Sequence, residues 1–344
     1  MTTPEPIKPP LDAPIATVAI SAGRLRAVVM GWGAVLQKLE MVRPQGPRLL
    51  TLGFSRPDDY AAHSPHFGAT AGRFANRIRD GRLTLDGQHL QLTRNQAGKH
   101  HLHGGYRGFG KRPWTVLAQA AGSVTLALVS PDGDEGYPGT LTAVCRYRLR
   151  DSATLRVELA AITDAPSPVN LVHHSYFNLD GGGDILQARL MIDADHYTPV
   201  DADLIPSGEI AAVAGTVFDF RRLRPIGHWV GSEPVPYDHN FVLRRSPQDS
   251  AGLSRAARLV AASGDLAMEV WTTEPGLQFY SGGKVTTAIA GHHGMPYGPF
   301  AGLCLEPQRF PDAPNHAHFP DAILRPGTVY RQVTEYRFSE VKPA

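Results

Sequence analysis

The sequence has little that would support a disulfide framework, a membrane span or a secretory signal. Only two of its 344 residues are cysteines, Cys145 and Cys304. Two are too few for a disulfide framework or a cysteine-rich zinc site, so both are expected to be small core residues. No run of about 18 apolar residues occurs, and the N-terminus lacks a basic segment followed by an apolar one. We therefore expect a soluble, cytoplasmic protein that has no membrane as a partner.

Charged side chains are also scarce. They make up 19% of the residues, and 34 Lys and Arg against 32 Asp and Glu leave a net charge of +2. This balance offers little attraction to a nucleic-acid backbone or an anionic membrane, so neither is an expected partner. A near-neutral chain suits a neutral ligand.

Glycine and proline are abundant, at 35 and 29 residues, and form many turns. Period-two alternation of apolar and polar residues recurs between these turns, whereas helical periodicity is hard to find. The clearest alternating segments are 124–129, 141–149 and 155–162. The pattern predicts an all-β sandwich or barrel, with short helices only near residues 57–62, 223–227 and 254–257.

No linker, charge run or internal repeat divides the chain. The length would permit about two domains or one large β unit, and the uninterrupted pattern favours the latter. We expect a single domain over residues 15–344, preceded by a mobile, proline-rich leader over residues 1–14.

Common catalytic loops find no support. The segment 105–112 nearly matches a phosphate-binding loop, but Arg112 stands where a hydroxyl would hold magnesium, and no amphipathic helix follows. It is expected to be a glycine-rich surface loop. The chain has neither the G-x-S-x-G motif of many serine hydrolases nor the H-E-x-x-H motif of zinc proteases.

Histidines are numerous and clustered. His100, His101 and His103 lie close together in the sequence, and His173 and His174 are adjacent. Such a group is compatible with a zinc or iron site, and equally with turn and surface histidines. Both interpretations stay open at this point.

Two extended segments present polar groups on one face. In residues 168–178, alternation puts Asn170, His174 and Tyr176 on the same side, which is typical of a pocket floor, while His173 points away. In residues 301–306, Cys304 and Glu306 share a face. Taken alone, Glu306 fits exposure at a strand end, or an ion pair to Arg309, better than a functional role. Asp238, before an apolar run, is compatible with capping a turn.

Eight ordered segments resemble the aldose 1-epimerase (mutarotase) family, and the resemblance extends from about Ile15 to Phe338. Their order and number make coincidence a poor explanation. The segments are GATAGRFANRI (68–78), HLHGG (101–105), SPDGDEGYPG (130–139), NLVHHSYFNL (170–179), YTPVDADLIPSG (197–208), YDHNF (237–241), TEPGLQFY (273–280) and LEPQRFPD (305–312).

The resemblance implies a fold, an activity and a site. The implied fold is a large antiparallel β-supersandwich of the galactose mutarotase type with a few short helices, and its concave face binds a free monosaccharide, a hexose or a pentose. Glu306 takes the position of the general base and His174 that of the general acid. No cofactor and no metal are implied. The matched sugar-binding positions are Asn76, Arg77, His103, Asp238 and Gln278, with Tyr176 beside His174 as a further candidate.

The implied chemistry suits these residue types. A base removes the proton from the C1 hydroxyl while an acid protonates the ring oxygen, so that the ring opens, rotates about C1–C2 and closes on the other face. His174 must then be partly protonated, which a nearby carboxylate would favour. Aromatic residues such as Tyr176, Phe279 or Trp114 are candidates for covering the apolar face of the sugar.

The chain departs from the family pattern at four positions. His101 and His173 stand where asparagine is usual, Gly110 replaces a common aspartate, and Gly283 replaces a common asparagine. These changes lie in or beside site motifs. They leave the mechanism intact and the preferred sugar open.

Other functions stay open at this level. One is a non-catalytic sugar-binding protein on the same scaffold. Another is a glycosidase that uses Asp238 and Glu306 as its two carboxyl groups. A phosphorylated sugar, bound through Arg77 and neighbouring basic residues, is a further option. The sequence does not distinguish a monomer from a homodimer.

Overall fold

The computed structural model describes residues 15–245 and 248–341. The expected leader at residues 1–14 lies outside this range. Almost all regular structure is antiparallel β-sheet, which confirms the predicted all-β class. Within the described ranges, no helix is long and apolar enough to cross a membrane.

The largest sheet has nine strands over the described residues, in the order β10-β11-β12-β13-β29-β25-β24-β17-β20. The alternating segments of the sequence form its first half, where every second residue of β12 is buried. The C-terminal strand β29 pairs with β13 on one side and β25 on the other. The strands are β10 (Thr115–Ala120), β11 (Ser123–Ser130), β12 (Leu141–Arg150), β13 (Thr154–Thr163), β17 (Arg189–Ile192), β20 (Arg224–Pro225), β24 (Ser254–Val260), β25 (Leu266–Thr272) and β29 (Tyr330–Glu340).

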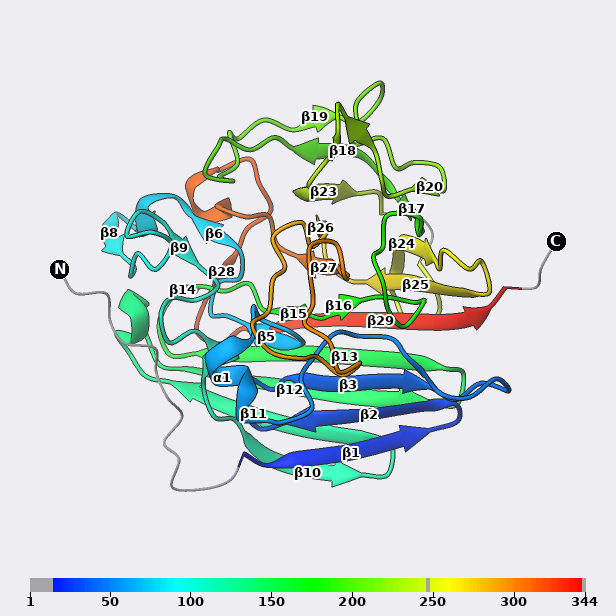
Figure 1. Cartoon of the computed structure of the whole chain (residues 1–344). Coiled ribbons are helices and arrows are strands. Elements are labelled where there is room, and N and C mark those ends of the chain that lie inside the picture. Colours follow the sequence, from blue (N-terminus) through cyan, green and yellow to red (C-terminus); the bar gives the residue numbers. More distant parts are fainter. Residues whose placement is uncertain (1–14, 246–247, 342–344) are drawn as a thin grey trace.

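A second sheet, β16-β27-β26-β23-β18-β19, lies in the upper half of Figure 1, with β29 running beneath it. Its central strands contain the matched motifs around Asp238, Gln278 and Glu306. Its strands are β16 (Tyr176–Phe177), β18 (Ala194–Thr198), β19 (Ala211–Ala212), β23 (Asp238–Leu243), β26 (Gly276–Tyr280) and β27 (Leu303–Gln308).

A third sheet at the N-terminal end covers the first half of the large sheet (Figure 1). Apolar residues of the two sheets, including Leu25, Leu126 and Tyr147, meet in the main hydrophobic core. Burial of this apolar area is the dominant force that holds the layers together. The third sheet consists of β1 (Thr17–Ala22), β2 (Leu25–Met30), β3 (Leu36–Met41) and β4 (Arg48–Leu49).

Short elements complete the fold and border the site. Two strand pairs matter most below, β5 (Ala69–Ala71) with β15 (Val172–His174), and β6 (Arg77–Ile78) with β9 (His101–Leu102). The remaining elements are β7 (Arg82–Leu85), β8 (Gln88–Gln91), β14 (Ser167–Pro168), β21 (Trp229–Val230), β22 (Glu233–Pro234), β28 (Ile323–Leu324), the helix α1 (Asp59–His63) and the 3₁₀ turns Arg79–Gly81, Phe109–Lys111, Asp134–Gly136 and Ala313–Asn315.

Two of the three expected helices are wrong. The helix near 57–62 corresponds to α1, but residues 223–227 contain β20 and residues 254–257 begin β24. Ala256, Ala257 and Leu259 of β24 are fully buried between β17 and β25. Pairing on both edges within a large sheet overrides the weak local preference of such a short segment.

The polar segment 168–178 is less regular than predicted. It divides into β14, β15 and β16, and each strand pairs with a different partner. Its residues 168–178 are nevertheless all buried. The chain thus passes from the pair with β5 to the sheet of β27, and this carries His174 to the junction of the two.

Candidate active site

Neighbouring strands place a grid of polar side chains on one face of the six-stranded sheet. Gln278 of β26 lies directly opposite Glu306 of β27 on one side and Asn240 of β23 on the other. Two residues along the same strands, Asp238, Tyr280 and Cys304 form the next row. Because residues i and i+2 of a strand share a face, both rows point the same way.

His174 meets this grid from β15. Its Nε2 lies 3.6 Å from Oε2 of Glu306, and both side chains are buried. Its other ring nitrogen, Nδ1, lies 3.5 Å from Sγ of Cys304. The structure thus brings together the two residues expected to be the acid and the base, and Arg309 pairs with Glu274 instead of Glu306.

Asp238 and Gln278 are held by a buried amide network. Gln278 donates a hydrogen bond of 2.6 Å from Nε2 to Oδ1 of Asp238. Gln308 donates from its own Nε2 to Oε1 of Gln278 at 3.1 Å and to Oδ1 of Asn240 at 3.0 Å. Sequence reasoning missed Gln308 and Asn240, although alternation along β27 and β23 would have placed them on the site face.

Asn76, Arg77 and His103 enter from the pair β6 and β9. The Asn76 backbone N–H donates to Nδ1 of His103 at 3.1 Å, which fixes the proton of this neutral imidazole on Nε2. Arg77 donates to Oδ1 of Asn76 at 3.3 Å and to Oε1 of Gln96 at 3.0 Å. Its Nη2 lies 3.9 Å from Oδ2 of Asp238, so the two halves of the site are joined by an ion pair.

A stack of rings encloses His174. Tyr176 stacks on it with ring centroids 5.2 Å apart, and its hydroxyl donates to the carbonyl of Pro65 at 2.9 Å. His66 also stacks on His174, at 5.7 Å, and contacts the ring of His103 at 4.8 Å. Sequence reasoning missed His66, whose signal was its position just before the segment 68–78.

Two of the aromatic residues suggested for the sugar face lie elsewhere. Phe279 is fully buried and stacks on Tyr237 at 5.2 Å, because alternation turns it away from the face that carries Gln278. Trp114 is buried in the main core, where its Nε1 donates to the carbonyl of Phe109. The prediction that either residue covers the apolar face of the sugar is therefore wrong.

Burial shifts the acid–base properties of the central pair. It raises the pKa of the Glu306 carboxyl, and the charge of Asp238 adds to the effect while Arg77 opposes it. Burial lowers the pKa of His174 to about 4, against opposing effects of its own backbone carbonyl and of Asp238. Burial thus favours the neutral form of each group in the sugar-free site, against the expectation that a nearby carboxylate keeps His174 partly protonated.

The residues that depart from the family pattern mostly have structural roles. His173 points away from the site, as the alternation predicted, and its Nδ1 lies 3.2 Å from the Tyr147 hydroxyl in the core. His101 is buried 2.6 Å from the hydroxyl of Tyr137. Gly283 lies beside Phe300 and Pro236, whereas Gly110 packs against Ala69, the pairing partner of His174.

The histidine-cluster metal site finds no geometric support. Within residues 15–245 and 248–341, the one group with three possible ligands in reach is His174, Cys304 and Glu306. Cys304 faces Nδ1 of the imidazole and Glu306 faces Nε2, so they flank opposite nitrogens of one ring. His101 is held by the carbonyl of Thr93 and by Tyr137 instead. Both cysteines are buried and free, as expected.

Comparison with known proteins places the chain in a family. The family model described as aldose 1-epimerase matches residues 16–337. The galactose mutarotase of Sus scrofa is 41% identical over 324 residues, 93% of each chain, and the aldose 1-epimerase of Escherichia coli K12 is 40% identical over 333 residues, 94% of each. The solved structure of a GalM/aldose epimerase homologue from C. elegans superposes with a TM-score of 0.88 at 31% identity, over 95% of this chain and all of that one. The chain thus belongs to the aldose 1-epimerase family.

Proposed function

We propose that this protein interconverts the α and β anomers of a free aldose, a hexose or a pentose, with Glu306 as general base and His174 as general acid. The observation that carries the proposal is the buried contact of 3.6 Å between Oε2 of Glu306 and Nε2 of His174. Family membership and the matched relatives support the same reaction.

The reaction needs one proton removed and one delivered. Glu306, as carboxylate, takes the proton of the C1 hydroxyl, while His174, as imidazolium, gives its proton to the ring oxygen. The bond between C1 and the ring oxygen breaks and leaves an aldehyde. Rotation about C1–C2 and the reverse transfers close the ring on the other face. Each positioned proton transfer accelerates the reaction by about 10²–10⁴-fold.

One proton on the pair is enough to form both the general base and the general acid. Burial raises the pKa of Glu306 and lowers that of His174, so each group favours its neutral form before a sugar binds. Transfer of the carboxyl proton to the imidazole, whose Nε2 lies 3.6 Å from Oε2 of Glu306, would give a carboxylate beside an imidazolium, the form that the proposed roles require. The transfer leaves the net charge of the pair unchanged, so it adds no uncompensated charge to the buried site.

The surrounding residues match the polar pattern of a sugar. Asp238 is an acceptor, whereas Arg77 and the Nε2–H of His103 are donors, and Asn76 and Gln278 offer both kinds of group. Asp238 is already oriented by Gln278 and Arg77 before a sugar arrives. Such preorganisation lowers the entropic cost of binding. We propose a free monosaccharide as the ligand and the cytoplasm as the location.

The direct test is anomer exchange on freshly dissolved sugars. Polarimetry or NMR exchange on α-D-glucose, galactose, xylose and arabinose should show acceleration over buffer for at least one of them. No acceleration for any free sugar would exclude the proposal. Sugar binding without exchange would instead identify a binding protein, and release of nitrophenol from aryl glycosides would identify a glycosidase.

A further inference from the structure

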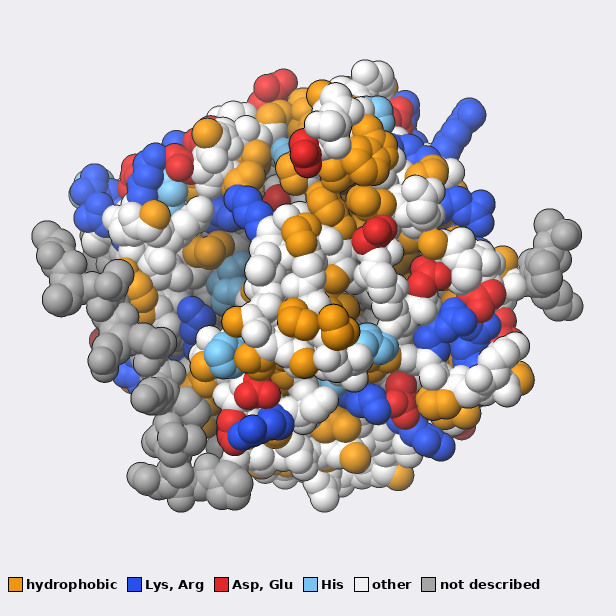
Figure 2. Space-filling model, in the orientation of Figure 1, with side chains coloured by type: hydrophobic (Ala, Val, Ile, Leu, Met, Phe, Trp, Pro, Cys, Tyr) orange, Lys and Arg blue, Asp and Glu red, His pale blue; other side chains and the backbone are white. Residues whose placement is uncertain are grey.

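A cavity of about 440 Å³ adjoins the candidate active site, and none of the eight residues expected in that site lines it. The cavity and the site meet at His66, which lines the cavity and also stacks against His174 and His103. Figure 2 shows histidine atoms recessed in a hollow of the surface, with Lys or Arg atoms above and below it. The cavity is therefore an extension of the site on its histidine side.

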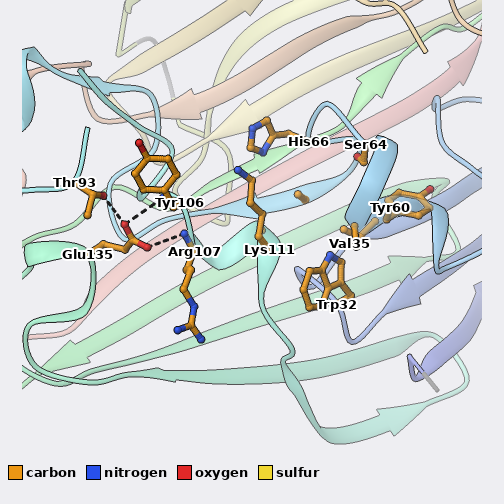
Figure 3. Close-up of a pocket in the computed structure, with 13 residues that line it drawn as sticks. Trp32, Val35, Tyr60, Ser64, His66, Thr93, Tyr106, Arg107, Lys111 and Glu135 are labelled. Carbon is orange, nitrogen blue, oxygen red and sulfur yellow. Dashed lines mark hydrogen bonds between the residues drawn. The ribbon is translucent and has the colours of Figure 1, made fainter. Parts of the chain in front are cut away.

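Lys111 supplies a positive charge to this cavity. Its ammonium group points toward the ring of His66 (Figure 3). Among the described residues, no partner lies within hydrogen-bond or ion-pair distance of its Nζ. Its charge helps to hold the pKa values of His66 and His103 low, although burial is the larger cause for both. Lys111 is thus the cation beside two neutral imidazoles.

The carboxylate of Glu135, which also lines the cavity, is committed elsewhere. It accepts hydrogen bonds from the backbone N–H groups of Tyr106 at 3.1 Å and Arg107 at 2.7 Å, and from the Thr93 hydroxyl (Figure 3). These bonds hold the loop in place, and the carboxylate acts on Lys111 through its charge, without a direct ion pair.

Gly110 keeps the space beside Lys111 open. A Cβ at this position would lie 3.1 Å from Cβ of Ala69 and 4.0 Å from Nδ1 of His66. A side chain here would therefore take up space next to His66, the residue at which the cavity and the site meet.

The proposed reaction sets which part of a sugar faces the cavity. Glu306 serves the hydroxyl on C1 and His174 serves the ring oxygen, which is bonded to C1 and C5. The atoms beyond the ring oxygen, seen from C1, are C5 and its exocyclic carbon C6. His174 and His103 border the cavity through His66, whereas the charges that act on Glu306 are those of Asp238 and Arg77. With His174 serving the ring oxygen, C6 lies on the side of the site that His66 shares with the cavity.

We infer, resting on the proposed function, that this cavity is a subsite for an anionic group on C6 of the aldose, a carboxylate or a phosphate, recognised by Lys111. Its substrates are hexuronic acids or hexose 6-phosphates in addition to neutral sugars. A lysine ammonium is a suitable point charge for either anion. Arg77 is a poorer candidate, because its guanidinium is engaged by Asp238, Asn76 and Gln96.

The test compares anionic with neutral sugars. NMR exchange between anomeric signals gives kcat/KM for galacturonate, glucuronate and glucose 6-phosphate, and for galactose and glucose as neutral references. Lys111→Met should lower the ratio of anionic to neutral kcat/KM roughly tenfold, the scale of one hydrogen bond to a charged group. Lys111→Arg, which keeps the positive charge, should retain most of the parent's ratio. Lys38→Met, the same charge change on β3, is the matched control and should leave the ratio unchanged.

A second variant covers the case in which Lys111→Met folds poorly. Gly110→Asp places a carboxylate beside Lys111 and should lower the same ratio. An equal ratio in the parent and in both variants would overturn the subsite while leaving epimerisation of neutral sugars intact. Absence of exchange with every sugar would overturn the proposed function as well. A response confined to the uronic acids or to the phosphate identifies which anion the subsite takes.

Discussion

At the scale of single residues, the candidate site depends on the acid–base properties of two side chains. Glu306 and His174 are both buried and in contact, so each sets the charge of the other. Neither acts as a lone group in water would. Their contact makes the effect of each substitution, and of pH, a direct test of the proposed roles.

Glu306→Gln and His174→Asn should each lower kcat by about 10²–10⁴-fold, because each removes one positioned proton transfer. Both replacements preserve approximate size and polarity, so the fold should persist. Anomer exchange followed by NMR measures the rate, and circular dichroism checks the fold. Near-normal turnover in either variant would contradict the assigned role.

The pH dependence of kcat/KM should be bell-shaped. Below a pH of about 4, the lowered pKa of His174, both groups carry a proton and no base is left. Above the raised pKa of Glu306, neither carries one and no acid is left. The measurement is NMR exchange across pH, corrected for the buffer-catalysed rate. A single rise centred near the ordinary histidine value of about 6.5, with no alkaline fall, would contradict the shifted pKa values of the pair.

At the scale of elements, strand register assembles the sugar-binding face. Antiparallel pairing sets Asn240, Gln278 and Glu306 side by side across three strands, although nearly 70 residues separate the first from the last. Gln308, two residues further along β27, connects these strands through its amide. The orientation of the Gln278 amide, and through it that of Asp238, depends on this network.

Gln308→Leu should therefore raise KM for the sugar more than it lowers kcat. It leaves the buried oxygens of Gln278 and Asn240 without their donor, which should cost about 1–3 kcal/mol of folding free energy. Denaturant unfolding and steady-state kinetics measure the two effects. Gln88→Leu, on the exposed hairpin of β7 and β8, is the matched control and should change neither. An equal loss in both variants would contradict the role of the network.

At the scale of the whole molecule, buried titratable groups make stability depend on pH in two opposing ways. Burial lowers the pKa of His101 and His239 to about 4 and that of His173 to about 3, so these histidines favour the folded state increasingly as pH rises toward about 6.5. Buried Glu274 has the opposite effect, because its pKa is raised to about 7.

The direction in which Glu274 changes stability with pH follows from its pKa values in the unfolded and the folded chain. With 4.5 in the unfolded chain and about 7 in the fold, its stabilising contribution is complete below 4.5 and is lost as pH rises to about 7. The amide side chain that Glu274→Gln introduces does not titrate. As pH rises from 5 to 8, the free energy of unfolding of the variant should therefore increase by about 2 kcal/mol relative to that of the parent. Glu233→Gln, at an exposed position, is the control. The prediction would be refuted if the difference in free energy of unfolding between Glu274→Gln and the parent stayed constant with pH.

Much of this protein was predictable from the sequence alone. Alternation with a period of two, between frequent turns, determined the all-β class and the faces on which His174, Glu306, Cys304 and His173 lie. Both are local properties, since the direction of a side chain along a strand depends only on its neighbours. Ordered motifs determined the family. That residues 15–344 form one domain stays a prediction.

Tertiary structure decided what depends on distant segments meeting. Strand pairing turned residues 254–257 from an expected helix into β24, and it brought His174, Gln308 and His66 to the same place from separate elements. Burial by the surrounding layers then lowered the pKa of His174 and raised that of Glu306. The cavity beside Lys111 exists only because loops far apart in the sequence surround it. None of these is a local property, because each requires the free energy of packing surfaces that are remote along the chain.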